Sequence, residues 1–92
     1  MASDDLSNIE SLASTLSAAG FHARAMHDSN VPLLFALGTK KSHSIDLRRR
    51  DGVLVIEYWH GYPDDDFISQ EAVDSFEEAL APIEAWLSKD AA

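Results

Sequence analysis

Four histidines and two neighbouring serines are the side chains of this 92-residue chain whose chemistry most resembles that of an active site. The histidines do not form the HExxH pattern, although two of them in neighbouring strands can converge in space. Ser42 and Ser44 flank His43, but adjacency in sequence does not activate a nucleophile, and no strained nucleophile turn surrounds them. We therefore expect no catalytic residue and no metal site, and a protein that is not an enzyme. The histidines are His22, His27, His43 and His60.

A run of three aspartates, at positions 64 to 66, is the second feature with metal-binding chemistry. A calcium loop of the EF-hand type needs alternating oxygen ligands, a glycine at its sixth position and a distal glutamate, and this segment lacks them. The glycines, at 20, 38, 52 and 61, are not spaced for a phosphate-binding loop. With no cysteine in the chain, thiolate ligands and disulfides are excluded. No cofactor is therefore expected.

An aromatic strand end is followed by an acidic loop between residue 57 and residue 66, and this segment is the candidate binding site. Because side chains alternate along a strand, Tyr58 and Trp59 point to opposite faces, and at least one should be partly exposed. Tyrosine and tryptophan are favoured anchors in protein interfaces. The alternative is that Trp59 packs beneath the following loop as core. The predicted partner-binding residues are Glu57, Trp59, Tyr62, Asp64, Asp65 and Asp66.

The net charge of −9 indicates what kind of partner such a site would accept. Nucleic acid and anionic membranes would be repelled, so neither is expected as a partner. A basic protein would be attracted, and its encounter would be accelerated. The alternative is that the charge only keeps the chain soluble. The one basic cluster, Arg48-Arg49-Arg50, is expected to pair with Asp46, Asp51 or Glu57.

Hydrophobic periodicity predicts two helices and four strands. The Asp51-Gly52 pair between two β-rich runs predicts a hairpin, and Ser75 with Glu78 predicts a helix N-terminus. Residues 67–73 fit either an edge strand or an earlier helical turn. The helices are expected over residues 4–19 and from residue 76 onwards, and the strands over residues 21–27, 33–37, 43–49 and 53–60.

This order of elements predicts a single α+β domain over residues 1–92. Both helices are terminal, so no βαβ crossover is available and the sheet should be antiparallel. We expect a two-layer sandwich with a four-stranded meander sheet and both helices on one face. The strand at 53–60 is apolar on both sides, so Val53, Val55 and Trp59 need cover on the other face. A partner, a second copy of the chain or the loop at 61–68 can supply it.

The chain is expected in the cytoplasm. Its first twenty residues carry acids and no basic residue, whereas a secretory signal begins with basic residues. No apolar run approaches the roughly 18–20 residues that span a bilayer.

The segments 45–59 and 75–87 resemble, in pattern, small acidic immunity proteins of bacterial toxin systems. The residues concerned are the hairpin Ile45-Asp46-Leu47 with Asp51-Gly52-Val53-Leu54-Val55-Ile56-Glu57-Tyr58-Trp59, and the tail Ser75-Phe76-Glu77-Glu78-Ala79-Leu80 with Ile83-Glu84-Ala85-Trp86-Leu87. The resemblance implies a non-enzymatic, inhibitor-like protein that binds one toxin tightly. The chain is more loosely similar to acidic chaperones of type III secretion, which carry further strands between their helices. That similarity implies the alternative, a secretion-chaperone-like or homodimeric adaptor that uses the outer sheet face.

Overall fold

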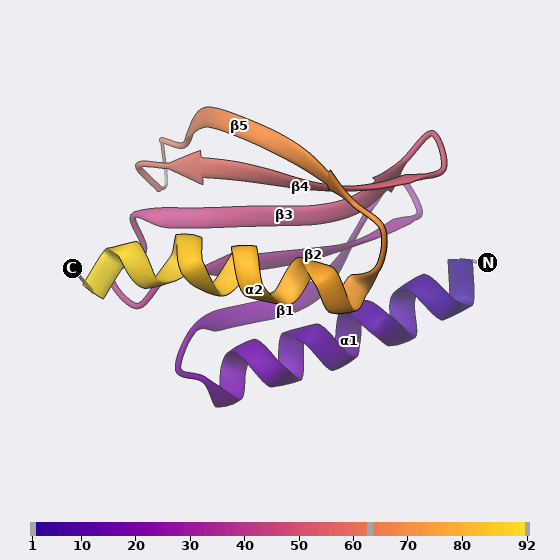
Figure 1. The fold of residues 1–92 in the computed structure, drawn as a ribbon, viewed down its shortest axis with the longest axis horizontal. Coiled ribbons are helices and arrows are strands. Elements are labelled where there is room, and N and C mark those ends of the chain that lie inside the picture. Colours follow the sequence, from indigo (N-terminus) through magenta and orange to yellow (C-terminus); the bar gives the residue numbers. More distant parts are fainter. Residues whose placement is uncertain (1, 63, 92) are drawn as a thin grey trace.

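Two helices cover one face of a five-stranded antiparallel sheet, whose strand order is β1-β2-β3-β4-β5 (Figure 1). The computed structural model describes residues 2–62 and 64–91, with side chains described for residues 5–62 and 64–90. The elements are α1 (Ala2–Ala18), β1 (His22–Asp28), β2 (Val31–Leu37), β3 (His43–Arg50), β4 (Val53–His60), β5 (Asp66–Val73), α2 (Phe76–Leu87) and a short 3-10 helix, η1 (Ser88–Ala91).

The predicted α+β class and antiparallel meander are confirmed, but the sheet has five strands rather than four. Residues 67–73 belong to β5, which pairs with β4 and forms one edge of the sheet. Every side chain of β5 except Val73 is exposed. An edge strand with almost no buried position shows little alternation in its sequence, which is why the helical alternative stayed open.

Two hairpin turns of two residues each set the register of the sheet. Asp51 and Gly52 both have positive φ, at 52° and 81°, and they join paired residues Arg50 and Val53. This confirms the predicted hairpin, because turns with two left-handed residues match the twist of the flanking strands. Ser29 and Asn30, with φ of 52° and 69°, make the same kind of turn between β1 and β2.

Both helices begin or end as their sequences predict. Gly20 follows α1 with a φ of +101°, a conformation that suits glycine. Ser75 caps α2 and accepts a hydrogen bond from the Glu78 amide at 3.1 Å. Trp86 fixes α2 on the sheet, because its indole N–H lies 3.0 Å from the Ser44 carbonyl and 3.2 Å from that of Trp59.

The hydrophobic core lies between the helices and the sheet. Helix α1 packs on β1 and β2, whereas α2 packs on β3, β4 and β5. No described helix has both the length and the apolar character needed to cross a membrane. The largest fully buried aliphatic side chains are Ile9, Leu16, Leu34, Ile45, Leu47, Ile56, Ile83 and Leu87.

Candidate functional site

The outer face, the side of the sheet away from the helices, carries the predicted binding residues of β4. Trp59 pairs with Ser44, and Glu57 pairs with Asp46, so these four side chains lie together on the outer face. The ring of Trp59 also packs edge-on against Phe67 of β5, with centroids 5.3 Å apart. Trp59 is therefore half-buried, between the exposed-anchor and core alternatives that the sequence left open.

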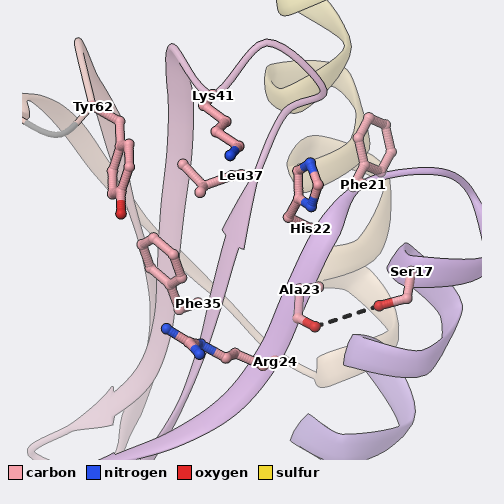
Figure 2. A pocket seen from close by; sticks show the side chains of 9 residues that line it. All are labelled: Ser17, Phe21, His22, Ala23, Arg24, Phe35, Leu37, Lys41 and Tyr62. Atoms are coloured by element: carbon pink, nitrogen blue, oxygen red, sulfur yellow. Dashed lines mark hydrogen bonds between the residues drawn. The ribbon is translucent and has the colours of Figure 1, made fainter.

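The loop between β4 and β5 folds back over the outer face. The Gly61 amide donates to the Ser42 carbonyl at 2.7 Å, which ties the start of the loop to β3. Farther along, the ring of Tyr62 lies 6.2 Å from that of Phe35 on β2 (Figure 2). Ser44 beneath is only 1% exposed. The loop thus supplies part of the cover that the apolar outer face needs, while Val53 stays 46% exposed.

The predicted binding residues differ in how far they reach the surface. Tyr62 is 42% exposed, Asp64 and Asp66 are exposed, and Asp65 is half-buried. Glu57 is buried, and Arg50 donates to both of its carboxylate oxygens, at 3.1 and 3.3 Å. The arginine pairing expected for Glu57 is thereby confirmed, and its carboxylate is already occupied within the chain.

Like charges lie close together on the outer face. Burial raises the pKa of Asp46; Arg48 opposes that shift, and the nearby carboxylates of Glu57 and Asp65 add to it. Burial likewise raises the pKa of Asp65, against a contact with the Ser44 hydroxyl, and Asp64 and Asp66 raise it further. At neutral pH the ionised carboxylates of this acidic cluster, Asp46 and Asp65, therefore make folding less favourable.

A second cluster joins Ser42 and His43 to Asp90. The sequence analysis considered Ser42 and His43 but did not single out Asp90. The Asp90 carboxylate accepts hydrogen bonds from the backbone amides of Ser42 and His43, at 3.1 and 3.0 Å. It also accepts from the Ser42 hydroxyl and contacts Nδ1 of His43. Burial alone would raise the pKa of Asp90, but these hydrogen bonds outweigh it and lower the pKa to about 2.

The geometry of this cluster differs from that of a nucleophilic triad. A triad places the serine and the carboxylate on opposite ring nitrogens of the histidine. Here both Ser42 Oγ, at 3.3 Å, and Asp90 contact the same atom, Nδ1 of His43. The cluster therefore acts as a clamp, referred to below as the Asp90 clamp, that attaches η1 to the loop between β2 and β3.

The rings of His43 and His60 do converge, as neighbouring strands allow, with centroids 4.7 Å apart. Within residues 5–62 and 64–90, however, no three or more histidine, aspartate or glutamate side chains are grouped so that they could hold a metal ion. The expectation of no metal and no cofactor stays a prediction.

Comparison of the chain with protein-family models, with curated proteins and with solved structures found no match. The resemblance to immunity proteins stays an expectation from the sequence pattern. What the chain binds must be inferred from its own surface.

Proposed function

We propose that the chain is a non-enzymatic, inhibitor- or immunity-like domain of the cytoplasm that binds a basic partner protein through the outer face. The observation that carries the proposal is the acidic loop folded over this face. It brings Asp65 close to Asp46, where burial and neighbouring carboxylates raise the pKa of both. Carboxylates that are unfavourable for folding are typical of functional sites. Cationic groups of a partner would relieve the repulsion.

Two aromatic rings beside the acids would supply the apolar part of the interface. Tyr62 rests on Phe35, and Trp59 rests on Phe67, so each ring is already positioned before a partner binds. Less side-chain entropy is then lost on association. An interface with aromatic anchors and acidic surroundings would discriminate strongly in favour of basic partners.

Measuring binding to a purified partner tests this function. A protein captured from the native host would be purified, and the kinetics of the binary complex would be measured at low and high salt. We expect the double variant Asp64→Asn/Asp66→Asn to associate more slowly and with a weaker salt dependence, because these acids steer the encounter. The control, Glu10→Gln/Asp74→Asn, removes the same charge from exposed positions on α1 and after β5. Equal effects of the two doubles, or a partner that is not basic, would contradict the proposal.

A second candidate is the homodimeric or secretion-chaperone-like adaptor. Solvent-exposed apolar side chains favour it. Phe67 and Ile68 on edge strand β5 are 51% and 50% exposed, and Val53 on β4 is 46% exposed. Exposed apolar patches often mark interfaces. Sedimentation equilibrium decides the homodimeric form: a dimer that Ile68→Asp converts to a monomer supports it, and a monomer at all concentrations rules the homodimer out.

A further inference from the structure

A pocket of about 390 Å³ lies at the corner of the sheet where β1 and β2 meet three loops and the end of α1 (Figure 2). Its volume falls within the range of small-ligand sites. Aromatic and aliphatic side chains form much of its lining, and Arg24 and Lys41 contribute cationic groups. The apolar side chains are Phe21, Ala23, Phe35, Leu37 and Tyr62.

The charges of this pocket are opposite in sign to those of the chain as a whole. No carboxylate lines it, although the chain carries a net charge of −9. Arg48, Arg49 and Arg50 all pair with acids, whereas Arg24 and Lys41 have no ion-pair partner among the described residues. Two cations left unpaired beside an apolar wall can receive an anion.

The backbone that carries the lining residues is held in place by pairing and hydrogen bonds within the fold. Arg24 lies directly opposite Phe35 in the paired strands β1 and β2. Lys41 sits in the loop after β2, where its amide donates to the Gly38 carbonyl at 3.0 Å, and the Asp90 clamp holds the next residue. Tyr62 follows Gly61, whose amide is bonded to the Ser42 carbonyl. A backbone ordered in advance lowers the entropic cost of binding a ligand. The exposed side chains of Arg24 and Lys41 would be ordered by the ligand itself.

We propose that this pocket binds a small aromatic phosphate monoester, of the chemical class of the nucleoside monophosphates. The planar ring would lie against Phe35 and Tyr62, since bases stack readily on aromatic side chains. The phosphate would be bound by Arg24 and Lys41, with His22 beside them. The acidic surface of the chain repels a nucleic-acid polymer, which carries many phosphates. Among the described residues no carboxylate lines this pocket, so one small anion bound there is repelled less.

This inference goes beyond the proposed protein-binding function, and only Tyr62 belongs to both sites. Loss of the cations at residues 24 and 41 should leave binding of a basic protein intact. Loss of the acids at residues 64 and 66 should leave the small ligand bound. Failure of one proposal is therefore distinguishable from failure of the other.

Isothermal titration of the full chain with AMP, GMP, CMP and UMP provides the test. Adenosine, inorganic phosphate and indole-3-acetate serve as probes for the ring alone, the phosphate alone and an aromatic carboxylate. We expect at least one nucleotide to bind saturably and more tightly than each of these three probes. Arg24→Gln and Lys41→Gln should each weaken that binding by about tenfold, because each removes a charged hydrogen bond to the phosphate.

The matched control is Lys40→Gln, which removes the same charge from an exposed neighbour that does not line the pocket. Binding to the control should equal binding to the wild type. The proposal is overturned if no nucleotide binds, if adenosine, inorganic phosphate or indole-3-acetate binds as tightly as the nucleotides, or if Lys40→Gln weakens binding as much as Lys41→Gln. Circular dichroism of each variant separates loss of binding from loss of fold.

Discussion

Asp90 attaches the C-terminal end of the chain to the sheet, although it lies only two residues from the last one. Its side chain is fully buried and accepts hydrogen bonds from two backbone amides of the loop that follows β2. Replacement by alanine would leave both amides without their partner, and each unsatisfied buried donor costs about 1–3 kcal/mol. We expect Asp90→Ala to lower the free energy of unfolding by about 3 kcal/mol in urea denaturation. Lys89→Ala, at the exposed neighbouring position, should change it little.

The same carboxylate predicts a loss of stability in acid. Its pKa is about 2 in the folded chain, below the ordinary value of 3.8, so the unfolded chain takes up the proton first as the pH falls. The stabilisation is complete above about pH 4 and disappears as the pH approaches 2, and it amounts to about 2 kcal/mol. The difference in unfolding free energy between wild type and Asp90→Asn should shrink over this interval. A difference that is constant from pH 6 to pH 2 would contradict a charged Asp90.

Gly38 is a further residue on which the Asp90 clamp depends. A Cβ at this position would meet the Asp90 carboxylate and would lie 2.7 Å from the Leu87 carbonyl oxygen. Because the second of these atoms is backbone, it cannot move aside easily. Gly38→Ala should therefore destabilise the fold by about 1–3 kcal/mol, measured as a lower urea midpoint. Thr39→Ala, at the exposed next position, is the control, and an equal loss there would show that the loop rather than the close contact matters.

At the scale of the elements, the two tight turns determine how the strands pair. Gly52 has a φ of +81°, and a Cβ added there meets no atom within 4 Å, so alanine would act through backbone conformation alone. We expect Gly52→Ala to cost about 1–2 kcal/mol in thermal unfolding. Asn30→Gly, at the equivalent position of the β1–β2 turn, should be neutral or stabilising, since Asn30 already has a φ of 69°. Destabilisation by both changes would contradict this account.

The elements that could be predicted from the sequence are those with a local signal. The Asp51-Gly52 turn and the Ser75 cap each depend on neighbouring residues, and both are found in the structure. Strand β5 lacks such a signal because its side chains are nearly all exposed at the edge of the sheet. The Asp90 clamp joins residues that are 47 and 48 positions apart, so no local pattern could have indicated it. The pocket at Arg24 and Lys41 likewise forms only when three loops and α1 meet the sheet.

In the molecule as a whole, the inner face of the sheet packs against the core, and the outer face is the one that we propose for binding. The helices cover the first and bury its aliphatic side chains. On the outer face, Ser44 Oγ, Trp59 Nε1 and Asp65 Oδ1 are buried without a hydrogen bond of ordinary geometry, although the Ser44 hydroxyl lies near Asp65 and the Trp59 indole near Asp46. Such groups weaken a fold, and in native proteins they often mark a function. Stability and binding should therefore oppose one another on this face.

Asp65→Asn tests that opposition in a single side chain. Burial raises the pKa of Asp65, so its ionised form destabilises the folded chain at neutral pH, and the cost disappears in acid where the carboxyl is protonated in both states. The variant should therefore unfold at a higher urea concentration than wild type at pH 7, and the gap should close at low pH. Binding of the basic partner should weaken by about 1 kcal/mol, because one cationic contact is lost.

Asp51→Asn is the matched control for this experiment, since it removes the same charge from an exposed turn at a position that asparagine tolerates. It should leave both stability and binding close to those of wild type. If Asp65→Asn raised stability without weakening the complex, the Asp65 carboxylate would destabilise the fold without contributing to binding. If it lowered stability at pH 7, the contact with Ser44 would outweigh the repulsion from Asp64 and Asp66. Only a more stable variant that binds less tightly fits an acidic cluster kept for a cationic partner.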